Sequence, residues 1–288
     1  MNNMKTGKKE KYERINAVNK WIIILVFLPI SFLVIYPLVY VVSAAFSPGN
    51  SIANLNIVPF GDGVTLDHFK RLFTETNFLT WFKNTLTIAV CTSAVTVVVA
   101  SLSAYVFSRF TFVFKKSMMM SLLVLQIFPS FVGMVAIYII LWRVNGLDTL
   151  WGLILVYIAG NIPYNTWLVK SYIDTVPRSL DEAARIEGAN HFKIYRSIMM
   201  PVIKPIITFL AITSFTGPWM DFIFPKMILR SPEKQTLALG LFGFITDKKN
   251  EFTTFAAGAL IVAVPFIIMF TLSQKMMVTS FGQAAVKE

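Results

Sequence analysis

Long stretches without any charged residue alternate with short polar segments along the chain. Six such stretches occupy residues 21–46, 85–108, 117–142, 149–169, 205–220 and 252–274. An α-helix needs about 20 apolar residues to cross the roughly 30 Å of hydrocarbon in a bilayer. Five of the six meet that length, and the fifth along the chain is interrupted by Asp221 before apolar residues continue to Pro225. The pattern predicts an all-α polytopic membrane protein with six transmembrane helices.

The distribution of Lys and Arg predicts how these helices are oriented. Both residues are retained on the cytoplasmic side during membrane insertion. With both termini in the cytoplasm, the inner segments hold 17 of the 26 Lys and Arg residues. We therefore expect cytoplasmic tails over residues 1–20 and 278–288. Between them we expect a transmembrane domain over residues 21–277, with spans at about 21–46, 85–108, 117–142, 149–169, 202–225 and 252–274.

Composition agrees with a membrane protein and argues against several other classes. Charged residues make up 14% of the chain, whereas soluble domains average about 25%. The net charge of +11 does not indicate nucleic-acid binding, because the predicted spans leave no domain to bind it. Cys91 is the one cysteine in the sequence, which excludes a disulfide framework. His68 and His191 lack metal-ligand spacing, and we interpret both as ordinary loop residues.

The sequence contains no nucleotide-binding or catalytic motif. There is no G-x-x-x-x-G-K-[ST] phosphate loop, no H-E-x-x-H and no G-x-S-x-G. Ion-coupled carriers usually keep an ionisable residue at the middle of the membrane. Asp221 is the one candidate, and its place toward the outer end of a span favours an interfacial, capping role. We infer that the energy for any transport comes from outside this chain.

The cytoplasmic loop over residues 170–204 contains the most specific local signals. Ser179 and Glu182 have the spacing of a capping box, which satisfies backbone N–H groups at a helix start. Gly188 supplies the positive φ that ends a helix sharply. We expect a short helix here, followed by a second, basic helix over residues 191–199. The first helix is expected to present a small, mostly apolar face made of Leu180, Ala183, Ala184 and Glu187.

This loop carries a resemblance to a known family. Glu182-Ala183-Ala184, three residues, Gly188, nine residues, Ile198, one residue and Met200-Pro201 resemble the EAA signature of binding-protein-dependent ABC importer permeases. The family pattern ends in Leu-Pro, so Met200 is a departure that keeps the apolar volume.

Other segments resemble the permeases of maltose, maltodextrin and related oligosaccharide importers. They are residues 125–129, 217–218, 236–241 and 255–258, and a C-terminal tail over 282–288 that has fewer glycines than is usual there. The resemblance covers nearly the whole chain and implies a type I ABC importer permease in the bacterial cell membrane, with an EAA coupling loop over residues 175–201.

The resemblance also implies partners and two sites. This chain and a second permease subunit would form the path for an oligosaccharide across the lipid bilayer. A cytoplasmic ABC ATPase dimer would hold ATP and magnesium, and this chain would bind no cofactor of its own. The coupling helix docking into the ATPase would consist of Leu180, Asp181, Glu182, Ala183, Ala184, Arg185, Ile186, Glu187 and Gly188. The loop reaching an extracellular sugar-binding protein would consist of Thr236, Leu237, Ala238, Leu239, Gly240, Leu241, Phe242, Gly243 and Phe244.

Three functional classes stay open at this point. An oligosaccharide importer permease explains the spans, the missing phosphate loop and the coupling helix together; maltodextrins lead, with galacto- and arabinogalactan oligosaccharides as alternatives. A secondary carrier explains the spans alone, and its uptake would follow an ion gradient. A membrane scaffold would show no transport.

Overall fold

The computed structural model describes residues 2–127, 130–246 and 250–285, and every regular element within these ranges is helical. Within these ranges, seven α-helices have 13 residues or more: α1 (Asn2–Phe46), α3 (Phe78–Arg109), α4 (Lys115–Ile127), α5 (Ser130–Arg143), α6 (Leu150–Asp174), α10 (Lys204–Met220) and α13 (Phe252–Ala285). The short elements are α2 (Asp67–Glu75), α7 (Ser179–Ile186), α8 (His191–Ile194), the π-helix η2 (Tyr195–Met199), α9 (Met200–Val202), α11 (Ile223–Ile228), α12 (Leu237–Phe242) and the 3-10 helices η1 (Ile52–Asn54) and η3 (Pro232–Lys234).

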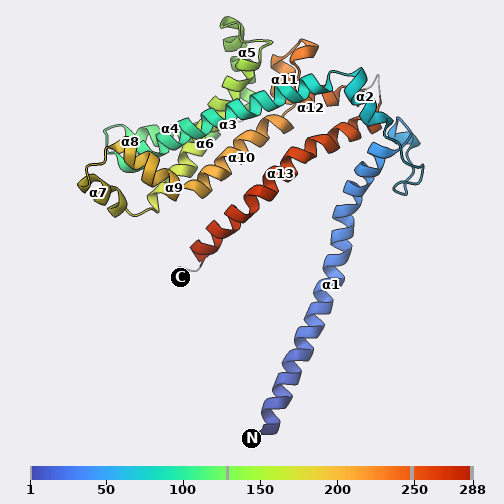
Figure 1. The fold of residues 1–288 in the computed structure, drawn as a ribbon, viewed down its shortest axis with the longest axis horizontal. Helices are drawn as coiled ribbons and strands as arrows, with labels where there is room; N and C mark the ends of the chain where they lie inside the picture. The colour runs from blue at the N-terminus through green and yellow to red at the C-terminus, as the bar shows by residue number, and fades with distance from the viewer. Residues whose placement is uncertain (1, 128–129, 247–249, 286–288) are drawn as a thin grey trace. The chain divides into compact units, whose positions relative to one another are not determined.

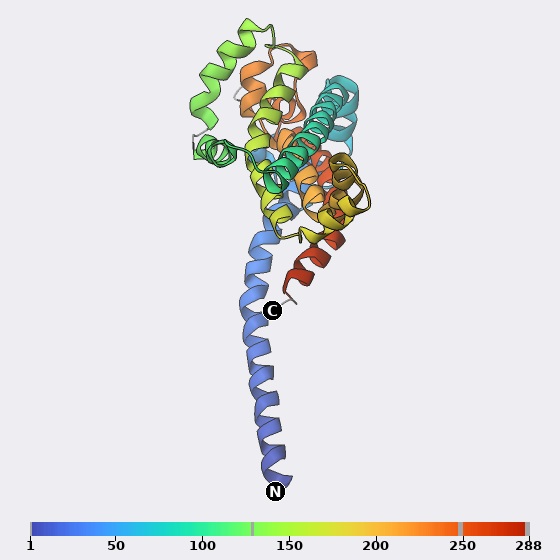
Figure 2. The ribbon, with the colours of Figure 1, turned by 90° about the vertical axis from the view of Figure 1, so that its left-hand side faces the viewer.

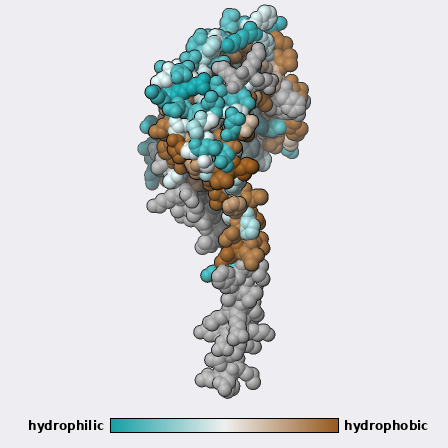
Figure 3. Space-filling view, turned by 90° about the vertical axis from the view of Figure 1, so that its right-hand side faces the viewer, coloured by the Kyte–Doolittle hydropathy of each residue, from teal (hydrophilic) through white to brown (hydrophobic). Residues whose placement is uncertain are grey.

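The chain divides into two compact units. The first consists of residues 1–70 and 250–260, and the second of residues 71–249 and 261–288. In the first unit, the described part of α1 presents mostly hydrophobic side chains on its surface (Figure 3). Most of its apolar segment Ile23–Phe46 is exposed, and the buried residues Ser43, Ala44 and Ala45 lie at its C-terminal end. Such exposure is expected of a helix whose solvent is lipid or another subunit.

A buried histidine joins three segments of the first unit. His68 is 4% exposed and lies in α2. Its Nε2 donates to the backbone carbonyl of Ser47 at 2.9 Å, and its Nδ1 lies 3.2 Å from the Thr254 hydroxyl. The interpretation of His68 as an ordinary loop residue is therefore wrong, because its ring hydrogen-bonds inside the fold. His191, by contrast, is exposed at the start of α8.

The second unit is built around α3. α6 and α10 pack along α3, and α4 packs against α6 (Figures 1 and 2). α7, α8 and α9 lie at the C-terminal end of α3, whereas α11 and α12 lie toward its N-terminal end (Figure 1). Each end has an apolar core. One is centred on Tyr105, Ile173 and Met199, and the other on Ile88, Leu153 and Ile228.

By length and composition, fewer helices of the structure could span a membrane than the sequence predicts. Three segments qualify, namely Ile23–Phe46, Phe78–Arg109 and Phe252–Thr271, and two bent helix pairs raise the number to five. α6 is 25 residues long, but Asn161 and Asn165 lower its mean hydropathy. Within the described residues the structure supports three to five spans, and the predicted six are not confirmed.

The helix boundaries differ from the predicted spans for local reasons. α3 begins at Phe78, ahead of the predicted start at residue 85, because the exposed Lys83 lies on its outer surface and does not interrupt it. The predicted span over residues 202–225 is broken at Asp221, where the backbone is extended. The helices α1 and α13 continue into the predicted tails, as far as Asn2 and Ala285.

Candidate functional site

The start of α7 differs from the predicted capping box. Arg178 occupies the N-cap position, and no side chain caps the helix there. Ser179 is the first helical residue, so its hydroxyl is one position too late to act as the cap. Glu182 instead donates its backbone N–H to the Arg178 carbonyl at 3.1 Å. The helix is present as predicted, but the proposed reason for its start is wrong.

The end of α7 is a Schellman motif. The Ala189 N–H donates to the Ala184 carbonyl and the Gly188 N–H to the Arg185 carbonyl, both at 2.9 Å. Gly188 has a φ of +82°, a conformation that L-residues other than Gly and Asn rarely adopt. A Cβ at this position would meet nothing within 4 Å. Backbone conformation, and not crowding, therefore explains glycine here within this chain.

α7 buries a different face from the one predicted. Two of its eight residues are buried, Asp181 and Ala184. Leu180, Ala183 and Glu187, which were expected to share the smooth face with Ala184, are exposed. Ile186 is the more exposed of the two large apolar residues of the helix, at 89% against 42% for Leu180. The surface available to a partner therefore combines two aliphatic side chains, Leu180 and Ile186, with the exposed residues Glu182, Ala183, Arg185, Glu187 and Gly188.

A polar network missed by the sequence analysis joins α7 to the end of α3. The Arg109 Nε lies 2.8 Å from the Asp181 Oδ2, and the two side chains are 4% and 6% exposed. This contact is an ion pair and not an aligned hydrogen bond. The Ser108 hydroxyl donates to Asp174 at 2.6 Å, and Lys170 forms an ion pair with the same carboxylate.

The predicted outer loop is mostly packed inside its own chain. Residues 237–242 form α12, and the Thr236 hydroxyl caps it by accepting from the Leu239 N–H at 3.4 Å. Thr236, Leu237, Leu239, Gly240, Leu241 and Phe244 are buried. Ala238 is half-buried, which leaves Phe242 and Gly243 exposed. Residues 247–249 lie outside the described residues.

The N-terminal end of α3 positions this loop. The Asn84 side chain donates to the carbonyls of Glu233 and Gln235 at 2.8 and 3.0 Å. The Trp81 indole donates to the Pro232 carbonyl at 3.1 Å, and the Leu237 N–H donates to the Thr85 hydroxyl at 2.8 Å.

A close contact between Gly240 and Trp81 gives a first prediction. A Cβ on Gly240 would lie 2.3 Å from the indole ring of Trp81, which is 8% exposed. Gly240→Ala should therefore lower the free energy of unfolding by about 1–3 kcal/mol through overpacking. Thermal unfolding in detergent checks this, with Gly160→Ala as the control because a Cβ there meets nothing within 4 Å. Equal midpoints for the two variants would contradict the packing argument.

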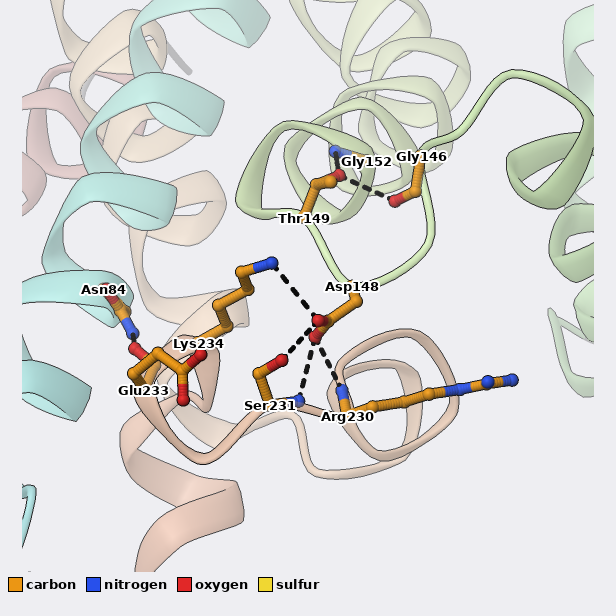
Figure 4. Close-up of polar contacts among 9 residues, drawn as sticks. All are labelled: Asn84, Gly146, Asp148, Thr149, Gly152, Arg230, Ser231, Glu233 and Lys234. Atoms are coloured by element: carbon orange, nitrogen blue, oxygen red, sulfur yellow. Dashed lines mark hydrogen bonds and ion pairs between the residues drawn. The ribbon is translucent and has the colours of Figure 1, made fainter.

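Asp148 holds the adjacent segment over residues 230–234 in place (Figure 4). Its Oδ1 accepts from the backbone N–H groups of Arg230 and Ser231, each at 2.9 Å. Its Oδ2 accepts from the Ser231 hydroxyl and from the Lys234 ammonium. Burial raises the pKa of the Asp148 carboxyl, but these hydrogen bonds outweigh that effect and hold the pKa well below its usual range. Asp148 is therefore a charged anchor between the α5–α6 turn and the 230–234 segment.

Asp221 has the capping role that its sequence position favoured. Its Oδ1 accepts from the N–H groups of Ile223 and Phe224 at the start of α11, at 2.8 and 3.4 Å. Its Oδ2 accepts from the Tyr157 hydroxyl at 2.8 Å. The carboxylate therefore joins the end of α10 to α11 and α6.

The two predicted sites lie at opposite ends of α3. Asn84 supports the segment over residues 233–235 and Arg109 contacts α7, and the 25 positions from one to the other correspond to about 38 Å of helix. Within the described residues, no group of three or more His, Cys, Asp or Glu is placed to hold a metal ion. The two predicted sites therefore occupy opposite ends of one helical bundle.

Residues 96–278 match the protein family described as "Binding-protein-dependent transport system inner membrane component". The chain belongs to this family. Both predicted sites, residues 180–188 and 236–244, lie within the matched region. This permease is thus a multi-pass inner-membrane component of an ABC transporter. It has no ATPase site of its own, and ATP is used by the partner ATPase subunit.

Several curated proteins are similar to this permease over most of their length. The maltodextrin transport system permease protein MdxG of Bacillus subtilis is 41% identical over 259 residues, which cover 90% of this chain and 92% of that protein. The maltodextrin permease MalD of Streptococcus pneumoniae is 38% identical, with 90% and 92% covered. The galactooligosaccharides permease GanQ of Bacillus subtilis is 37% identical, with 88% and 91% covered.

A solved structure shares the fold. The permease resembles a chain of a bacterial ABC transporter involved in the import of the acidic polysaccharide alginate, with a TM-score of 0.77 and 21% sequence identity. The match covers 91% of this chain and 96% of that one. The all-helical architecture is therefore that of an ABC importer permease.

Proposed function

We propose that this permease translocates oligosaccharides, with maltodextrins as the preferred substrates. Two of the similar proteins, MdxG and MalD, are named for maltodextrin transport and are 41% and 38% identical to it. Galactooligosaccharides are the second candidate, because GanQ is 37% identical. The similarity to these proteins supports a neutral oligosaccharide over the acidic polysaccharide of the structural relative.

The observation that carries the mechanism is the exposure of α7. A two-turn helix is marginal in water by itself, yet α7 is held by Asp181 and Ala184 and stopped by Gly188, while its remaining side chains face outward. We propose that this exposed surface docks into a cleft of the cytoplasmic ATPase dimer. Leu180 and Ile186 supply apolar contact, and Glu182 pairs with a basic group of the ATPase.

The opposite end of the bundle is proposed to meet the extracellular sugar-binding protein. In the segment Thr236–Phe244 the side chain of Phe242 is 40% exposed, and it is the one large side chain of that segment placed to reach a partner. The buried residues around it act as a rigid base. A second permease subunit completes the path, with six spans and both termini of this chain in the cytoplasm.

The experiment that tests this function is uptake into proteoliposomes containing the complete complex. We expect uptake of labelled maltodextrin to require the binding protein and ATP hydrolysis. It should persist when proton and sodium gradients are collapsed. Uptake of galactooligosaccharide alone would favour the second substrate, and uptake that follows an ion gradient without ATP would overturn the proposal.

A further inference from the structure

The attachment of α7 to the rest of the chain depends on polar contacts with the last residues of α3. Arg109 is the last residue of α3, and its guanidinium makes two separate contacts. Nε faces the Asp181 carboxylate at 2.8 Å, and Nη2 donates to the Val176 carbonyl at 2.9 Å. One side chain of α3 therefore holds both the first turn of α7 and the segment that leads into it.

In a second contact, a side chain next to α7 reaches back to the backbone of α3. The Arg178 Nη2 donates to the Ser108 carbonyl at 3.3 Å, and the Ser108 hydroxyl donates to Asp174 at the end of α6. The C-terminal end of α3 is thus connected to the α6–α7 connection on both sides of Val176. These contacts join residues that are 66 to 70 positions apart in sequence.

The ion pair is also hard to break. Both charged side chains are almost completely buried, so separating them would leave a charge without its partner in a region of low dielectric constant. Ala184 is the one other buried residue of α7, and its small side chain contributes apolar contact without fixing direction. The pair is therefore the stiffest connection between α7 and the bundle.

We propose that Arg109 and Asp181 are positioning residues that transmit the displacement of α7 to α3. This inference rests on the proposed docking of α7 to the ATPase. When nucleotide-driven closure moves α7, the ion pair makes α3 move with it as one body. Because Trp81, Asn84 and Thr85 of α3 hold the outer segment over residues 232–237, the displacement reaches the opposite end of the permease along a single helix.

Exchanging the charges of Arg109 and Asp181 tests whether the pair transmits the displacement of α7 or only stabilises the fold. In the full complex, we expect Arg109→Gln and Asp181→Asn to keep the ATPase bound and hydrolysing ATP. The amount of sugar taken up per ATP hydrolysed should fall by about tenfold or more. The double exchange Arg109→Asp with Asp181→Arg restores the opposite charges and should recover most of the lost coupling.

The exposed pair Arg71–Glu75, at 3.2 Å with side chains 36% and 65% exposed, provides the matched control. The corresponding variants Arg71→Gln and Glu75→Gln should leave uptake per ATP unchanged, because exposed pairs contribute little. Unchanged coupling in both Arg109→Gln and Asp181→Asn would overturn the proposal, as would a double exchange that folds and assembles without any recovery. Failure of the unmodified permease to bind the ATPase would instead overturn the proposed function.

A distance measurement keeps the test decisive if the charge variants do not fold. Spin labels at Ser179→Cys on α7 and Val106→Cys on α3, both exposed positions, are introduced with Cys91→Ser. Their separation should change by less than about 2 Å between the nucleotide-free and ATP-bound complexes, because the two helices move together. A change of about 5 Å, one helical turn, would show that α7 slides past α3 and would overturn the inference.

Discussion

Replacing Ile186 with aspartate is expected to release the ATPase from the permease. Ile186 is 89% exposed on α7, so the substitution does not disturb packing within this chain. If docking buries that side chain, its loss removes roughly 1.5–3 kcal/mol of apolar burial. Placing a carboxylate in the closed interface adds a desolvation cost. Together these effects should weaken binding by about 3 kcal/mol, or about a hundredfold in dissociation constant.

The measurement is titration of the purified ATPase onto the permease in nanodiscs. Ile186→Leu keeps the apolar volume and should bind within about threefold of the unmodified protein. Ile57 lies in the segment between α1 and α2 and is exposed to a similar degree, 79%, so Ile57→Asp controls for adding a surface carboxylate. Unweakened binding by Ile186→Asp would place the docking surface elsewhere on the chain.

The helical membrane architecture was predictable because charge is so costly in hydrocarbon that its absence marks the helices. The exact spans were less predictable. α6 carries Asn161 and Asn165, yet it packs along α3, so its place in the bundle depends on packing that hydropathy does not register. Asp221 breaks α10 because its carboxylate has two backbone N–H groups to cap, a competition that an apolar pattern does not show.

The helix α7 was predictable in position and in its end, but not in its orientation. The φ of +82° at Gly188 confirms the predicted stop, since glycine at such a position has a conformational cause. The prediction of which face of α7 is buried was wrong, because Asp181 lies on the buried face and forms an ion pair with Arg109. The single local signal was opposite charge: an arginine ends one apolar stretch and an aspartate opens a helix 72 residues later. Two residues so far apart in sequence form no periodic pattern from which their contact could be predicted.

The segment at the N-terminal end of α3 shows the same limit. The loop over residues 236–244 was predicted as a partner-binding segment, yet most of it is buried beneath contacts from Trp81, Asn84 and Thr85. Its capping residue Thr236 follows the ordinary preference for a hydroxyl at a helix start. The anchoring role of Asp148 depends on residues 82 to 86 positions later in the chain, which only the folded structure brings together.

Gly188→Val is expected to uncouple ATP hydrolysis from sugar uptake while the permease still inserts and assembles. A β-branched side chain at a φ of +82° costs at least about 1–2 kcal/mol, so the turn after α7 relaxes toward a conformation that shifts the exposed surface. Uptake per ATP should fall by about tenfold, whereas Gly188→Asn, which tolerates this conformation, should keep most of it.

Gly63 is a matched control, because it has a φ of +90° and equally open surroundings but lies in the segment before α2. Gly63→Val introduces the same strain away from α7 and should leave the ratio of uptake to hydrolysis unchanged. Equal losses in Gly63→Val and Gly188→Val would mean that general destabilisation, and not the geometry of α7, limits transport.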